Sequence, residues 1–159
     1  MKIGVLSDTH LKGVPEQLGE SITHHFRDVD MVLHAGDVVE STVLDYFSDR
    51  DVRAVAGNMD SWQLKEINPV KMIIPVENFK VGLIHGWGSP VGIEDRIRKE
   101  FDTIDVLVYG HTHNPTSHIR NGVLFFNPGS PTCKRFAAHN TIGILEVGEG
   151  ITPHIITID

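Results

Sequence analysis

The first third of the chain alternates short apolar runs with amphipathic stretches, and this order restricts its possible folds more than any other feature. Between the first two runs, Leu18, Ile22 and Phe26 recur at every fourth position, as on one face of a helix. A second helix is expected to follow Ser41. A strand–helix–strand order favours a parallel sheet with right-handed crossover connections. The three apolar runs cover residues 3–6, 31–35 and 52–56.

The rest of the chain is rich in predicted strands. Asn121-Gly122 is a strong hairpin signal between two such strands, and Glu77-Asn78 divides another pair. One further helix is expected over residues 92–101, where Ile93, Ile97 and Phe101 are spaced by four. We therefore expect one domain over residues 1–159, with two sheets packed face to face and helices outside. The predicted strands cover residues 70–76, 80–85, 106–109, 118–120, 123–126, 141–147 and 151–158.

Composition excludes several classes of protein. Hydrophobic residues make up 40% and charged residues 22% of the 159, as in an ordinary globular domain. A net charge of −7 argues against a broad basic surface for nucleic acid or membrane. The single cysteine, Cys133, excludes a disulfide framework and a thiolate zinc cluster, and we expect an inert thiol. No apolar run approaches the roughly 18 residues of a membrane span, so we expect a cytoplasmic protein.

Five short polar motifs directly follow predicted strands. Each motif alone is also compatible with an ordinary turn, so the conjunction carries the prediction. Open α/β sheets bind ligands at the carboxyl ends of their strands, where these side chains would gather. Imidazole and oxygen donors without thiolate suit Mn²⁺, Fe, Ni²⁺ or Zn²⁺. The motifs are Asp8-x-His10, Gly36-Asp37, Gly57-Asn58-x-Asp60, His85-Gly86 and Gly110-His111-x-His113.

These motifs, in this order, resemble the calcineurin-like metallophosphoesterase superfamily. The small size and Asn127-Pro128-Gly129-Ser130 are similar to its single-domain phosphodiesterase branch, which is related in fold to the retromer scaffold subunit. The resemblance covers about residues 1 to 135. It implies a four-layer α/β/β/α sandwich, with two packed mixed β-sheets and a dinuclear metal site at the carboxyl ends of strands.

The resemblance also implies the metal ligands and the reaction. Asp37 would bridge two divalent ions, with Mn²⁺ expected and Ni²⁺, Fe or Zn²⁺ as alternatives. A hydroxide bridging the two ions would hydrolyse a small phosphate ester, which makes the protein a metal-dependent phosphodiesterase. Asp37, Asn58 and His85 are the expected catalytic residues. The ligands would be Asp8, His10 and His113 for one ion, and Asn58, His85 and His111 for the other.

Two positions depart from the family pattern. Met59 stands where many members carry a histidine proposed to protonate the leaving group, and methionine cannot do so. The departure favours phosphodiesters and substrates with good leaving groups. Trp87 stands where relatives often have another histidine; it is expected either to stack on a substrate or to pack.

Three further residues are candidates for supporting roles. Arg135 is expected either to contact a substrate phosphate or to form a surface ion pair. The amide of Asn58 is expected to turn an N–H toward a phosphoryl oxygen, and Trp87 is the third candidate for a substrate contact. Asp60 is expected to orient a ligand or to stabilise a turn. His34 is expected to support the site from behind or to be an ordinary strand histidine.

Two other functions stay open at this point. The same fold could serve as a protein-interaction scaffold with little or no catalysis, but a scaffold would not need a complete ligand set. A nuclease acting on long DNA or RNA is the other alternative, and the acidic charge balance counts against extended nucleic acid. Small members of the family commonly pair, so a homodimer or higher homo-oligomer is expected.

Overall fold

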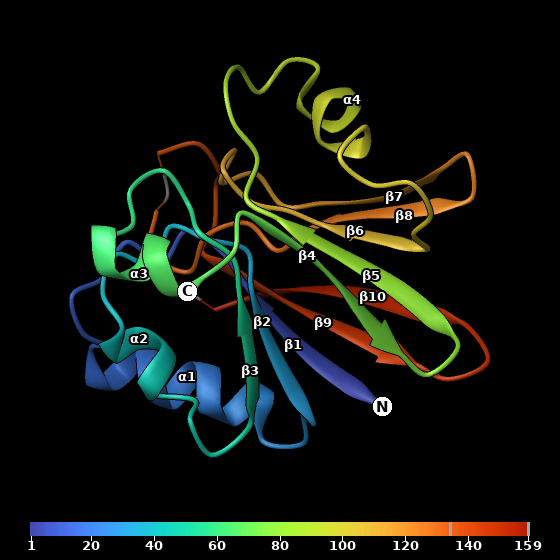
Figure 1. The fold of residues 1–159 in the computed structure, drawn as a ribbon. Coiled ribbons are helices and arrows are strands. Elements are labelled where there is room, and N and C mark those ends of the chain that lie inside the picture. The colour runs from blue at the N-terminus through green and yellow to red at the C-terminus, as the bar shows by residue number, and fades with distance from the viewer. Residues whose placement is uncertain (134, 159) are drawn as a thin grey trace.

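Two five-stranded sheets face one another in the computed structural model, which describes residues 1–133 and 135–158 (Figure 1). In the first sheet β1, β2 and β3 run parallel, and β9 and β10 continue it antiparallel. Its strands, in spatial order, are β10 (Ile151–Thr157), β9 (Thr141–Val147), β1 (Lys2–Leu6), β2 (Met31–His34) and β3 (Asp51–Ala54).

The second sheet is also mixed. Its three central strands are parallel, and an antiparallel strand closes each edge. Its strands, in spatial order, are β4 (Lys71–Val76), β5 (Phe79–Ile84), β6 (Val106–Val108), β8 (Val123–Asn127) and β7 (Thr116–Arg120).

Helices cover the outer faces of the two sheets (Figure 1). α1 (Glu16–Phe26) buries Ile22 and Phe26 against the first sheet, beside α2 (Thr42–Asp45). On the other side, α4 (Ile93–Arg98) packs Ile97 against Leu107 and Phe125 of the second sheet. The predicted four-layer arrangement of two mixed sheets between helices is therefore confirmed.

The main core lies between the two sheets. Side chains from both inner faces meet there, and the largest, Phe126, is fully buried. Because parallel strands covered on both faces bury every side chain, β1 and β2 appear in the sequence as nearly continuous apolar runs. The contributors from central strands include Ile3, Val5, Leu33, Val81, Leu83, Val106, Val108 and Phe126.

One element escaped the sequence prediction. α3 (Trp62–Ile67) is preceded by the N-cap residue Ser61, whose side chain accepts a hydrogen bond from the Leu64 amide at 3.4 Å. Only Leu64 is buried in this helix, while Trp62 is 65% and Ile67 70% exposed. The helix therefore lacks the apolar stripe on which the prediction relied. α4 is also shorter than expected, since it ends at Arg98.

None of the four helices in residues 1–133 and 135–158 has the length and apolar character that a bilayer span needs.

Candidate metal centre

The five polar motifs lie in the loops that follow β1, β2, β3, β5 and β6. These loops bend sharply, because Asp8, His10, Asp37, His111 and His113 all have positive φ, between 48° and 70°. A left-handed conformation at a residue other than glycine costs on the order of 1–3 kcal/mol and persists only where its surroundings enforce it. Five of the seven residues predicted to bind metal thus have a strained backbone.

The first group of donors contains Asp8, His10 and His113. The Asp8 Oδ1 atom lies 3.2 Å from His113 Nε2 and 3.8 Å from His10 Nε2. The other oxygen, Oδ2, accepts hydrogen bonds from the Ser7 hydroxyl at 2.5 Å and the His111 amide at 3.0 Å. The hydrogen bonds to Oδ2 therefore fix the orientation of the Asp8 carboxylate, and Oδ1 faces two imidazoles.

Asp37 lies between this group and the next. Its Oδ1 accepts a hydrogen bond from the Met59 amide at 2.7 Å. Its Oδ2 is 3.6 Å from His10 Nε2 on one side and 3.4 Å from His85 Nε2 on the other. The free oxygen of Asp37 therefore reaches donors of both groups, as a bridging carboxylate must.

The second group contains Asn58, His85 and His111. His85 Nδ1 donates to the Ala35 carbonyl at 2.7 Å, which leaves Nε2 as the unprotonated nitrogen, 3.1 Å from Asn58 Oδ1. His111 Nε2 donates to the Gly88 carbonyl at 2.9 Å, so its Nδ1 faces the same Asn58 oxygen at 3.2 Å. Backbone carbonyls thus select the tautomer in which each imidazole offers a lone pair.

Both groups fit a cation. The Asp8 Oδ1 atom is buried and has no hydrogen-bond partner among the described residues, which is costly for a carboxylate. In the second group the Asn58 amide oxygen and the lone pairs of two imidazoles converge. All three are acceptors, so a proton or a metal ion between them is needed to hold them together. Nitrogen and oxygen donors of this kind suit divalent ions such as Mn²⁺ or Zn²⁺.

The buried charged groups of the centre shift one another's pKa values. Burial alone would raise the pKa of Asp8, but attraction to the nearby imidazoles of His10 and His113 outweighs it and holds this pKa well below its usual range. The same pairing with Asp8 raises the pKa of His113 to about 9. Burial would likewise raise the pKa of Asp37, and the interaction with His85, 3.4 Å away, lowers it instead. The centre therefore stabilises positive charge.

A close approach of two loops explains the glycine before Asn58. A Cβ atom at Gly57 would lie 2.9 Å from the Asp37 Cα and closer still to the Asp37 amide nitrogen and Oδ1. Such contacts cannot be relieved by a side-chain rotation, because two of the three atoms belong to the backbone. Only glycine lets the loops that carry Asp37 and Asn58 pack this closely.

Asp60 and His34, which were predicted to support the site, accept hydrogen bonds from backbone amides rather than from the predicted metal ligands. Asp60 accepts from the Gly57 amide at 2.7 Å and the Val39 amide at 2.8 Å, so it joins the loops that follow β2 and β3. His34 accepts from the Gly36 amide at 3.2 Å and contacts the Thr9 hydroxyl at 3.1 Å. Burial lowers the pKa of His34 to about 3, which keeps it neutral.

Trp87 and Arg135, two of the residues predicted to contact substrate, are near different groups of the centre. Trp87 is 44% exposed and directly precedes Gly88, the hydrogen-bond partner of His111. Arg135 lines a cavity of about 550 Å³ together with His10 and His113. The structure therefore brings Arg135 beside the first group and Trp87 beside the second, while the Met59 side chain is 58% exposed.

Two residues at the centre were missed or misjudged from the sequence. Cys133 lines the same cavity as His113; burial would raise the pKa of its thiol, but the hydrogen bond with His113 lowers it. The sequence analysis expected an inert thiol and did not place Cys133 at the centre. Phe136 was not considered, and its ring centroid lies 5.4 Å from that of His113. No motif in the sequence links either residue to the centre.

Known proteins are similar to this chain over nearly its whole length. The sequence model of the calcineurin-like phosphoesterase superfamily domain matches residues 1–150. A probable metallophosphoesterase of Methanothermobacter thermautotrophicus is 36% identical over 160 residues, which cover 98% of this chain and 92% of the relative. A phosphodiesterase of Methanocaldococcus jannaschii is 32% identical over 160 residues, 92% of this chain and 93% of the relative.

One solved structure has the same fold as this chain. Vps29 of Entamoeba histolytica, crystallised in complex with Zn²⁺, superposes with a TM-score of 0.75 at 22% identity. The superposition covers 100% of each chain. At this identity the likeness concerns the fold alone.

Proposed function

The chain belongs to the calcineurin-like phosphoesterase superfamily, and from this premise we propose that it is a metal-dependent phosphodiesterase acting on a small phosphate ester. One observation carries the proposal. Six side chains form two adjacent groups, and the free oxygen of a seventh, Asp37, lies within 3.6 Å of a nitrogen in each.

The proposed ligands follow from these groups. Asp8, His10 and His113 would hold one divalent ion, Asn58, His85 and His111 would hold the other, and Asp37 would bridge them. When bound, such ions supply a hydroxide nucleophile near neutral pH and positive charge for a phosphate. We propose Mn²⁺ as the metal, because the described donors of both groups are imidazole nitrogens and carboxylate or amide oxygens.

The chain's own residues contribute positioning. Asp37 is held by the Met59 amide, so its free oxygen cannot rotate away from the two groups. The Asn58 Oδ1 atom faces His85 and His111, and its Nδ2 has no hydrogen-bond partner among the described residues. Because Asn58 is exposed, this amide can donate to a phosphoryl oxygen of a bound ester.

Two exposed side chains would contact the rest of the substrate. Arg135, on the side of His10 and His113, offers a guanidinium to a phosphate oxygen. Trp87, on the side of His111, offers an aromatic face to an ester group. Asn58, Trp87 and Arg135 are therefore the proposed substrate contacts.

Met59 carries a consequence for the choice of substrate. A thioether cannot deliver a proton to the departing oxygen, so the rate should depend strongly on the acidity of the leaving alcohol. Aryl diesters should be hydrolysed much faster than dialkyl diesters. A series of aryl methyl phosphates with graded phenol acidity measures this dependence, and a flat series would contradict it.

The proposal is tested by metal content together with hydrolysis of bis(p-nitrophenyl) phosphate. Purified protein should retain close to two divalent ions, and Mn²⁺ should restore activity after chelation. Asp37→Asn should abolish hydrolysis and weaken metal retention, while the matched surface variant Asp28→Asn should retain both. Urea unfolding of each variant separates loss of the site from loss of the fold. Wild-type hydrolysis that survives complete chelation would overturn the mechanism.

One observation favours the alternative that the protein is an interaction scaffold. Trp62, Ile67 and Val70 are each at least 65% exposed around α3, and exposed apolar side chains can serve a protein interface. A protein that retains metal but hydrolyses no diester would favour the scaffold. Degradation of long single-stranded DNA in preference to small diesters would favour the nuclease. The expected homo-oligomer stays a prediction, which sedimentation velocity checks.

A further inference from the structure

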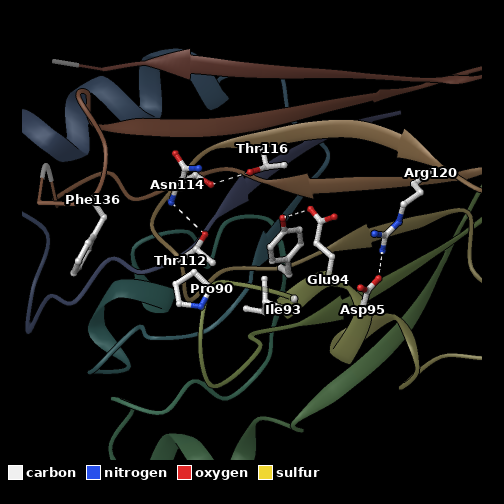
Figure 2. A pocket seen from close by; sticks show the side chains of 11 residues that line it. Pro90, Ile93, Glu94, Asp95, Thr112, Asn114, Thr116, Arg120 and Phe136 are labelled. Carbon is white, nitrogen blue, oxygen red and sulfur yellow. Dashed lines mark hydrogen bonds and ion pairs between the residues drawn. The ribbon is translucent and has the colours of Figure 1, made fainter.

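A cavity of about 610 Å³ beside α4 takes no part in the proposed chemistry (Figure 2). Ile93 and Glu94 of α4 form one wall, and Asn114, in the loop before β7, and Thr116, the first residue of β7, form another. Figure 2 shows Phe136 at one end of this space and the Arg120–Asp95 pair at the other. Its size falls within the range of small-molecule sites.

The cavity opens beside the metal centre. Thr112, which lines it, stands between the two proposed ligands His111 and His113. Phe136 lines it too, and the same ring borders the smaller cavity that contains His10 and His113. Phe136 is therefore a wall common to both spaces, and an ester group attached to a phosphate at the centre can extend past it.

The charged lining residues leave the cavity without an unpaired cation. Arg120 is the one Lys or Arg among the described lining residues; it pairs with Asp95 at 2.9 Å and lies 4.7 Å over the Phe125 ring. Glu94 accepts from the Tyr109 hydroxyl at 2.6 Å and from His118 at 2.9 Å. A second phosphate would find two carboxylates and no unpaired Lys or Arg among the described lining residues, so the cavity suits an uncharged group.

The remaining walls offer stacking and hydrogen bonding. Phe136 is 59% exposed, and although the Arg135 guanidinium lies 5.3 Å from its ring centroid, the exposed part of the ring is available to a ligand. The Asn114 side-chain amide makes no hydrogen bond within residues 1–133 and 135–158, although its backbone bonds to Thr112 and Thr116. Pro90 and Ile93 add apolar surface to the lining of the cavity. An aromatic face, a free amide and an apolar floor together match a ring with polar substituents.

We propose that this cavity binds one ester group of the substrate, an uncharged ring-bearing group such as a nucleoside, which stacks on Phe136 and hydrogen-bonds to Asn114. The inference rests on the proposed function, because it names the class of diester that the metal centre would hydrolyse. Phe136 and Asn114 then determine specificity and take no part in the bond-breaking step.

Two esters with the same leaving group test the proposal. The substrates are the p-nitrophenyl ester of thymidine 5′-monophosphate and methyl p-nitrophenyl phosphate, each assayed with Mn²⁺ for kcat/KM. The wild type should prefer the thymidine ester. Phe136→Leu should reduce this preference about fivefold or more, as expected for a lost base–aromatic stack. Asn114→Ala should reduce it about two- to tenfold, as expected for one lost hydrogen bond. Asn78→Ala, in the exposed β4–β5 turn, should keep the wild-type preference and rate.

The outcomes separate this proposal from the proposed function. Equal kcat/KM for the two esters in the wild type, or a preference that both variants retain, would overturn the cavity assignment while leaving the phosphodiesterase intact. Hydrolysis of neither ester would overturn the proposed function. In that case, titration of metal-free protein with thymidine, followed by amide NMR shifts, decides the cavity: shifts at Asn114 and Phe136 that both variants lose support it, and unchanged spectra overturn it.

Discussion

Replacing Asp60 by alanine should destabilise the protein strongly, because this one side chain joins two loops of the metal centre. Its carboxylate is 5% exposed and accepts the amides of Gly57 and Val39 at 2.7 Å and 2.8 Å. Val39 has a φ of 83°, an unfavourable conformation for a β-branched residue, so the bond from its amide also holds strained backbone. Alanine leaves both donors without this partner.

The magnitude follows from these two bonds. A hydrogen bond to a charged group contributes about 1.5–3 kcal/mol, so losing both should reduce the free energy of unfolding by about 3–6 kcal/mol. A typical domain has about 5–15 kcal/mol in total, so the variant should be marginally folded. Asp60→Asn keeps one acceptor oxygen and should lose about half as much.

Urea unfolding followed by circular dichroism measures this effect. EDTA should be present throughout, because bound metal would stabilise the native state by itself. Asp28→Ala is the matched control, since Asp28 is 67% exposed and pairs only with its neighbour Arg27 among the described residues. An Asp60→Ala protein within about 1 kcal/mol of the wild type would refute the reasoning, because two lost charge-assisted bonds cannot cost so little.

Three further predictions address the rest of the structure. Gly57→Ala should abolish metal binding, because its Cβ would lie 2.9 Å from the Asp37 Cα; calorimetric titration with Mn²⁺ checks this, and unchanged affinity would contradict it. Metal-free protein should lose stability on the order of 1–3 kcal/mol as the pH rises from 6.5 to 9, because solvent screening reduces the full effect of the His113 shift. The reason is that Asp8 raises the pKa of folded His113 to about 9, so its protonated form favours the native state below that window. Unfolding curves in EDTA should show the loss in the wild type and a flatter profile in His113→Gln. Ile97→Ala should cost about 2–5 kcal/mol, since the side chain is fully buried between α4 and the second sheet; a thermal midpoint equal to the wild type's would argue against this packing.

Much of the architecture follows from local patterns in the chain. The buried strands β1, β2, β5 and β6 are visible as apolar runs, because strands covered on both faces need no polar alternation. Each of these runs is followed by a polar motif, so the edge of the sheet that carries the chemistry could also be predicted. α3 could not, because a helix that buries one side chain leaves no periodic signal.

The roles of individual site residues depended on contacts between distant parts of the chain. Asp60 could have been a ligand support or a turn residue until its partners, Val39 and Gly57, were known. The direction of the His85 and His111 lone pairs is decided by the carbonyls of Ala35 and Gly88. Neither carbonyl is marked by a side chain, and backbone carbonyls look alike in every sequence.

The sequence by itself therefore determined which donors the protein has and at which strand ends they stand, because residue type and hydrophobic period are local properties. Only the tertiary structure decided that the Asp37 oxygen reaches both groups, that Cys133 and Phe136 lie against His113, and that a cavity opens next to Thr112. The physical reason is that such proximities arise where the two sheets pack together, and they depend on backbone strain and long-range hydrogen bonds that no short stretch of sequence encodes.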